Sequence, residues 1–179
     1  MGARTEVFHL QDGDWAILRA TRLRALLENG ESFAGDYGHE AHLPESHWHD
    51  QIAAQDWCAV RVGDSIAAIM GVDVVDRHDC NCWVHGCWVD PVHRGHGFTR
   101  MMIDWLDGVS CERRWVRQGL GVWPENIRAI SVWERLGFEA YGTPQPSRRR
   151  PGQVYVAMRR DVPDAARLLD PASATLPVS

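Results

Sequence analysis

Residues 89–102, VDPVHRGHGFTRMM, most constrain how this chain can fold. A valine-rich strand leads into this stretch, Gly95 and Gly97 stand at alternate positions, and an amphipathic helix follows. Glycine tolerates the left-handed backbone that a tight strand-to-helix turn requires. Such a turn aims backbone N–H groups outward at the positive end of a helix, where phosphate binds well. The stretch predicts a strand–turn–helix unit that binds phosphate, or else a tight turn that binds nothing.

Arg94 adds a guanidinium group suited to bidentate contact with phosphate. The glycine spacing is too short for the three-glycine dinucleotide fingerprint, and no acidic residue stands in the expected ribose position. The phosphate is therefore not expected to belong to a dinucleotide of that kind.

The rest of the chain alternates between strand-like and helix-like periodicity. Early strands, a central strand–turn–helix and a later strand–helix–strand predict one α/β domain with a mixed sheet, residues 1–160. Residues 161–179 are rich in Pro, Ala and Ser and are predicted to form a loose tail. Gly30 and Gly137 are predicted to end helices. The expected strands are 5–10, 57–62, 65–75, 82–89, 119–123, 139–143 and 154–160, and the expected helices are 14–30, 46–54, 98–109 and 124–138.

Two motifs in this order resemble the GNAT N-acetyltransferase superfamily. Residues 89–99 resemble its acetyl-CoA signature, in which a strand ends in V-x-P and continues as R/Q-x-x-G-x-G/A; Thr99 replaces the final small residue. Residues 126–138, NIRAISVWERLGF, are similar to the family helix N-x-x-A-x-x-x-Y-x-x-x-G-F. Residues 30–52 also resemble the acceptor-side loop and helix of small bacterial members.

The resemblance implies the GNAT fold: a mostly antiparallel, twisted sheet of six or seven strands with a splayed parallel pair, flanked by about four helices. It also implies acetyl-CoA as co-substrate. The pyrophosphate would bind the amides of residues 95–99, the pantetheine arm would pair with residues 87–89, and an N–H near Trp88 or Val89 would meet the thioester carbonyl. The expected cofactor-binding residues are Cys87, Trp88, Val89, Arg94, Gly95, His96, Gly97, Phe98, Thr99, Asn126 and Trp133.

The resemblance further implies an N-acetyltransferase that acts on a primary amine of a small molecule or peptide, by direct attack in a ternary complex. The amine must lose a proton to a base. Many family members use a carboxylate on the strand matching residues 83–89, which here contains none. His85 is the first candidate base, because its pKa is near neutral, and Glu40 is the second. The alternatives are a histidine packed in the sheet and a solvated loop carboxylate.

Two details of the catalytic residues stay open. Trp133 stands where the family has a tyrosine, and an indole N–H is no acid near neutral pH. Ser131, Tyr141 or water could protonate the leaving thiolate, or the thiolate could leave unprotonated. Cys87, predicted by strand alternation to share a face with Trp83 and His85, is interpreted as a buried thiol and not as a nucleophile.

The composition of the chain excludes several classes of enzyme and of binding partner. All 19 basic residues are arginine, which removes Schiff-base and pyridoxal enzymes, Walker-A NTPases and lysine-dependent kinases. A net charge of −5 argues against nucleic acid or an anionic membrane as partner and makes cationic small molecules easier to accommodate. No apolar run could span a membrane and no secretory signal is recognisable. Five cysteines without a signal favour reduced thiols and a cytoplasmic location. The edge strands of the predicted sheet could pair with those of a second copy, so a homodimer stays an open alternative.

Two further groups of residues have the composition of binding sites. His78, Cys80, Cys82, His85 and Cys87 lack a paired zinc spacing, and no metal site is expected. The arginines at 148–150 are predicted at a solvated hairpin tip, with contact to the adenosine 3′-phosphate or the acceptor as the alternative. Three function classes remain: a catalytic N-acetyltransferase, which is favoured, a non-catalytic acyl-CoA sensor, and a metal-binding interaction domain.

Overall fold

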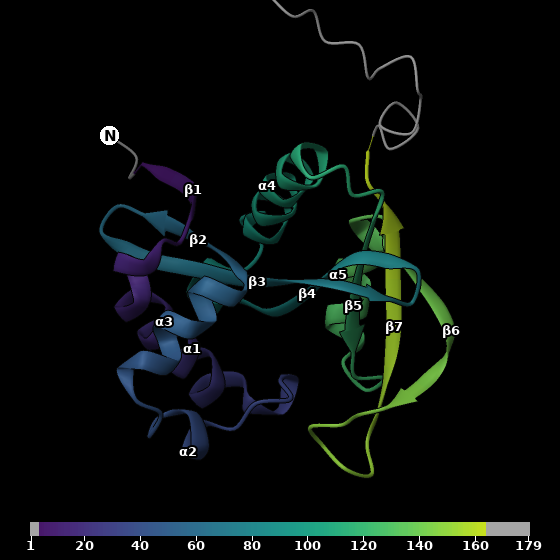
Figure 1. The fold of residues 1–179 in the computed structure, drawn as a ribbon, viewed down its shortest axis with the longest axis horizontal. Helices are drawn as coiled ribbons and strands as arrows, with labels where there is room; N and C mark the ends of the chain where they lie inside the picture. The colour runs from purple at the N-terminus through teal and green to yellow at the C-terminus, as the bar shows by residue number, and fades with distance from the viewer. Residues whose placement is uncertain (1–3, 164–179) are drawn as a thin grey trace, which may run out of the picture.

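The computed structural model describes residues 4–163. These residues form a seven-stranded sheet in the order β1-β2-β3-β4-β5-β7-β6, with helices on both faces (Figure 1). The strands are β1 (Thr5–His9), β2 (Asp56–Val62), β3 (Ser65–Arg77), β4 (Cys80–Val89), β5 (Arg117–Val122), β6 (Glu139–Pro146) and β7 (Val154–Asp161). The helices are α1 (Trp15–Asn29), α2 (Tyr37–Glu40), α3 (Glu45–Ala54), α4 (Phe98–Glu112) and α5 (Ile127–Arg135).

The sheet opens between β4 and β5, which run parallel. They pair over three positions, from Cys82 with Gln118 to Val84 with Leu120. Beyond that point β5 pairs with β7 on its other side, and β4 continues to Val89 with no partner on this side among residues 4–163. Every other neighbouring pair is antiparallel. The predicted mixed sheet with one splayed parallel pair is therefore confirmed.

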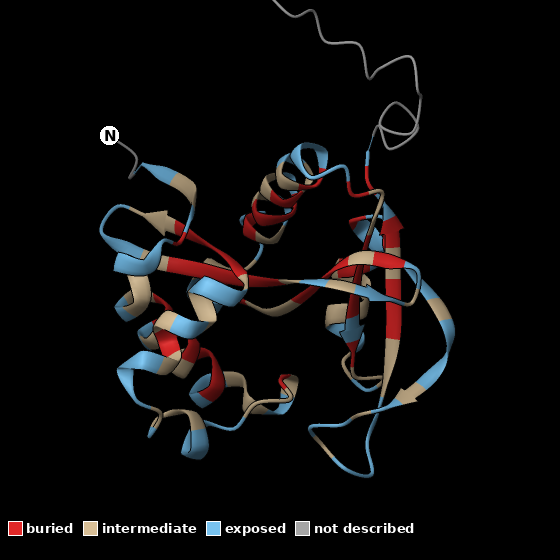
Figure 2. Cartoon of the chain, viewed as in Figure 1, coloured by how far each residue is buried: buried red, intermediate tan, exposed pale blue. Residues whose placement is uncertain are grey.

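Each face of the sheet has its own core. On one face α4 and α5 pack, with Met102, Ile103 and Trp133 among the buried residues. On the other face α1 and α3 pack, with Leu18 and Trp48 buried. Figure 2 shows the buried residues concentrated along the central strands and on the side of α4 that faces the sheet. Burial of this apolar surface, at roughly 25 cal/mol per Å², is the main stabilising contribution.

The helix ends differ from the sequence prediction at one glycine. Gly137 has φ +89° and ends α5 in the predicted left-handed conformation. Gly30 has φ −54°, which is right-handed, and it begins a 3-10 turn after α1 ends at Asn29. Helix α2 lies between the expected helices 14–30 and 46–54, and the Asp36 side chain caps it by accepting the His39 N–H at 2.8 Å.

The C-terminal strand extends slightly past the predicted domain boundary. Strand β7 includes Asp161, and Val162 is 2% exposed and donates its N–H to the Val116 carbonyl at 2.9 Å. The remainder of the predicted tail, residues 164–179, lies outside the described residues. Within residues 4–163, no helix has the length and apolar character needed to cross a membrane.

Candidate active site

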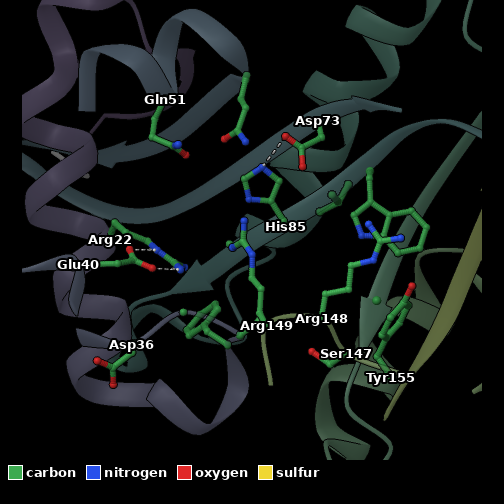
Figure 3. Close-up of a pocket in the computed structure, with 18 of the residues that line it drawn as sticks. Arg22, Asp36, Glu40, Gln51, Asp73, His85, Ser147, Arg148, Arg149 and Tyr155 are labelled. Carbon is green, nitrogen blue, oxygen red and sulfur yellow. Dashed lines mark hydrogen bonds and ion pairs between the residues drawn. The ribbon is translucent and has the colours of Figure 1, made fainter. Parts of the chain in front are cut away.

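A cavity of about 1180 Å³ opens beside the splayed strands (Figure 3). Its walls come from the α1–α3 region, from β3, β4 and β5, and from the loop between β6 and β7. His85 and Glu40, the two candidate bases, both line it. Ser131 and the glycine turn do not. The fold thus brings two of the three predicted catalytic residues to one cavity although they lie on different elements.

The His85 ring lies flat against the backbone of β3. Gly71 makes this possible, because a β-carbon there would collide with the ring. The Trp57 indole packs edge-on against the same ring, with centroids 4.9 Å apart at 89°. Nε2 of His85 lies 3.7 Å from an Asp73 carboxylate oxygen and, among the described residues, has no hydrogen-bond partner. The ring is therefore packed between β3 and Trp57, and its Nε2 is buried without a hydrogen-bond partner among residues 4–163.

The pKa of His85 is lowered to about 4. Burial is the main cause, and the positive charges of Arg22, Arg149 and Arg77 act in the same direction, while Asp73 opposes them. The imidazole is therefore neutral at pH 7 and can accept a proton or orient a water molecule.

This lowered pKa predicts a pH-dependent stability. Below the ordinary histidine pKa of 6.5, His85 is protonated in the unfolded chain but stays unprotonated in the folded protein. The free energy of unfolding therefore falls as the pH drops from about 6.5 towards 4. Because the side chain is 27% exposed, solvent screening reduces the effect. We expect the wild type to lose about 1 kcal/mol more than His85→Gln between pH 7 and pH 5 in urea unfolding. Identical losses in the two proteins would contradict it.

A bulge in β4 corrects the prediction for Cys87. Gly86 has φ +58°, and the β3–β4 register shifts between the pairs at Ile69 and Gly71. Cys87 therefore packs against the core under α4 and α5, whereas His85 lies on the opposite face beside Trp57. The expectation that Cys87 shares a face with His85 is wrong, because the extra residue shifts the alternation. Burial raises the pKa of the Cys87 thiol to about 12, so the thiol stays protonated.

Glu40 forms a bidentate ion pair with Arg22. Both bonds measure 2.9 Å, and the two side chains are 15% and 10% exposed. The pair lies directly against Gly35, where a β-carbon would force the ends of both side chains to move. Because both carboxylate oxygens accept from Arg22, His85 is the better placed of the two candidates to accept a proton.

The glycine turn has the backbone that the sequence predicts. Gly95 and Gly97 have φ +84° and +81°, and nothing lies within 4 Å of a β-carbon built at either position. The Met101 N–H is the first to bond within α4, to the Gly97 carbonyl. Among the described residues, the amides from Gly95 to Arg100 have no backbone partner. Open space and unpaired donors at a helix N-terminus fit a phosphate group.

Arg94 is turned towards the protein. Its Nε donates to the Val89 carbonyl at 3.1 Å and its Nη2 to the Asn29 side chain at 2.6 Å. The Asn29 oxygen also accepts the Trp88 indole N–H at 3.3 Å. Asn29, which sequence reasoning missed, therefore ties the end of α1 to the glycine turn. A direct contact between Arg94 and phosphate stays a prediction.

The residues on α5 stabilise that helix. Asn126 caps it, accepting the Ala129 N–H at 3.1 Å, and its Nδ2 donates to Ser32 across the splay at 3.4 Å. Trp133 is 8% exposed and packs edge-on against Phe138. Their predicted contacts with the cofactor stay predictions.

The cavity also contains a tyrosine that sequence reasoning missed. The Tyr155 hydroxyl lies 3.2 Å from Nε2 of His78, and both residues line the cavity. Tyr141, the tyrosine named from sequence, instead packs under Arg159 and lines a smaller hollow. Tyr155 could not be found from sequence, because it reaches the cavity only through the pairing of β7 with β5. Residues 4–163 contain no group of three or more side chains arranged to hold a metal ion.

Comparison with known proteins gives a consistent result. The model of the acetyltransferase (GNAT) family matches residues 22–138. No curated protein matches the chain. The fold is similar to that of a GNAT-family acetyltransferase from Streptococcus pneumoniae, at 14% identity and TM-score 0.74, covering 89% of this chain and 99% of that one.

Two further solved structures share the fold. The ribosomal-protein-S18-alanine N-acetyltransferase of Escherichia coli is 18% identical, with TM-score 0.64 and coverage of 89% of this chain and 94% of that one. The spermidine N-acetyltransferase of Vibrio cholerae, in complex with CoA and spermine, is 17% identical, with TM-score 0.64 and coverage of 90% and 98%. At these identities the likeness concerns the fold.

Proposed function

The chain belongs to the GNAT acetyltransferase family, and we propose that it transfers the acetyl group of acetyl-CoA to a primary amine of a small molecule or peptide. The observation that supports this most directly is the unpaired edge of β4. This edge leads from the cavity at His85 to the glycine turn at Gly95 and Gly97. Strand β4 would thereby connect the proposed phosphate site at the glycine turn with the proposed site for the amine acceptor in the cavity.

The residues of the turn and of β4 would hold the co-substrate. The unpaired amides of residues 95–99 suit its pyrophosphate. Residues 87–89 are free on the β5 side to pair with an extended arm. When bound, acetyl-CoA supplies an activated acetyl group, to which the amine nitrogen adds while coenzyme A departs as the thiol.

His85 would act on the acceptor. It is neutral at pH 7, and its imidazole would take the proton that the acceptor ammonium loses before the free amine attacks, directly or through water. Asp73, 3.7 Å away, stabilises the imidazolium that results. Trp133 cannot supply a proton to the leaving group, and Tyr155 is the one tyrosine among residues 4–163 that lines the cavity.

A non-catalytic acyl-CoA sensor is the alternative, favoured by Trp133 in the place of the family tyrosine. One experiment separates the two functions: thiol release from acetyl-CoA in the presence of a panel of primary amines, alongside calorimetric binding of acetyl-CoA. We expect micromolar binding and amine-dependent thiol release. Binding without release for every amine would favour the sensor, and absence of binding by the folded protein would overturn both.

A further inference from the structure

We infer that the acceptor bears an acid group, carboxylate or phosphate, which Arg148 and Arg149 bind in the cavity. The inference rests on the proposed amine acetylation. It names the chemical class of the acceptor, which neither the family nor the overall charge specifies. The cationic residues of the cavity, their lack of partners and the anchoring of their loop support it independently.

Positive charge predominates in the cavity wall. The wall contains four arginines and three carboxylates: Arg22, Arg77, Arg148 and Arg149, and Asp36, Glu40 and Asp73. Arg22 and Glu40 neutralise each other through their bidentate pair. Arg148 and Arg149 form no ion pair or hydrogen bond with another residue in the range 4–163, and both guanidinium groups are directed into the cavity (Figure 3). Two arginine side chains are thus left to bind an anion from solution.

The loop between β6 and β7 is anchored so that these arginines face the cavity. Arg150 donates from Nη2 to the Gly30 carbonyl at 2.8 Å and packs over Trp123. The Ser147 N–H donates to the Gln153 carbonyl at 2.8 Å, and the Arg150 N–H donates to Ser147 Oγ at 3.0 Å. The loop therefore crosses to the end of α1 and is fixed there. The loop is the tip of the antiparallel β6–β7 hairpin, with Arg148 and Arg149 exposed as predicted, and both arginines also line the cavity.

The cavity has a separate place for the amine. In Figure 3 the Arg149 guanidinium lies beneath the His85 ring, while Asp73 lies on the other side of that ring. Asp73 is the group that favours a cation beside this ring, and it opposes the positive charges of Arg22, Arg149 and Arg77 there. An acceptor with both signs of charge satisfies this arrangement, its amine towards Asp73 and His85 and its acid group towards the arginines.

These arginines are not placed to bind the phosphates of the coenzyme. The cavity wall includes no residue from 87 to 99, whereas the unpaired amides of the glycine turn lie at the N-terminus of α4. The net charge of −5 favoured cationic acceptors. The inference instead rests on the local charge of the cavity, because binding depends on the nearby groups within about one Debye length.

The test is direct binding of matched ligands, measured by calorimetry. The probes are L-methionine, L-phenylalanine and L-glutamate with their carboxamides, and 1-aminoethylphosphonate with ethylamine. We expect at least one acid probe to bind about ten- to a hundredfold more tightly than its uncharged partner, since hydrogen bonds to charged groups contribute about 1.5–3 kcal/mol. The carboxylate and phosphonate arms show which acid is preferred.

Variants locate the effect. The double variant Arg148→Gln/Arg149→Gln should abolish the preference for acids, and lysine at both positions should restore part of it. Arg4→Gln removes one positive charge at an arginine whose side chain is 87% exposed beside β1, and it should leave the preference for acids unchanged. Equal binding of acids and uncharged partners, or a preference that survives the double variant, would overturn the inference. Failure of the proposed function appears separately, as acid binding without thiol release from acetyl-CoA.

Discussion

Gly97→Leu is expected to raise the dissociation constant for acetyl-CoA at least a hundredfold. The φ of +81° at Gly97 disfavours any side chain by about 1–2 kcal/mol. The new side chain would also occupy the open space in front of the amides at the start of α4. Blocking several charge-assisted hydrogen bonds, each contributing about 1.5–3 kcal/mol, accounts for a loss of that size. Titration calorimetry of the folded variant measures it.

Gly137→Leu is the matched control for this prediction. Gly137 also has a left-handed backbone, with φ +89°, and nothing lies within 4 Å of a β-carbon built there. It ends α5 instead of beginning α4. Both variants should lose similar stability in urea unfolding, but only Gly97→Leu should lose acetyl-CoA binding. Equal loss of binding in both would mean that instability, and not the glycine turn, explains the result.

The glycine turn could be predicted from sequence because its determinants are local. Two left-handed residues within three positions, followed by an apolar helical stripe, define the conformation without reference to the rest of the chain. The mixed sheet with its splayed parallel pair was accessible through the family resemblance. The motif of residues 89–99 and that of residues 126–138 resemble one family, whose fold then supplied the long-range pairing.

The cavity could be predicted only in part, because its contacts depend on register and on distant segments. His85 was identified from its strand, but the bulge at Gly86 moved Cys87 to the other face. The bond from Arg150 to the carbonyl of Gly30 joins positions 120 residues apart and determines where the neighbouring arginines point. Residue composition likewise indicates the net charge of the chain and not how charge is distributed around one cavity.

His85→Gln is expected to lower kcat for acetyl transfer by about 10²–10⁴-fold, the usual contribution of a positioned base. Glutamine keeps approximate size and hydrogen-bonding capacity but cannot take up a proton. His85 lies in the cavity and not at the glycine turn. The proposed contacts of the turn with acetyl-CoA are therefore unchanged, and the dissociation constant for acetyl-CoA should stay within about twofold of the wild-type value. Steady-state thiol release with one competent amine gives kcat, and calorimetry gives the binding constant.

His47→Gln provides the control, since it makes the same substitution at another histidine in the same cavity. It should reduce kcat by less than about tenfold, because the His47 ring packs edge-on against Trp48 of α3 and not against His85 or Tyr155.

The pH profile separates a base from a merely structural residue. With a pKa of about 4, His85 is already deprotonated above pH 6, so wild-type kcat/KM should show no histidine titration between pH 6 and 8. In His85→Gln the proton must pass to water or hydroxide, so kcat should rise more steeply with pH than in the wild type. Parallel profiles with a uniformly lower rate would instead assign His85 to positioning.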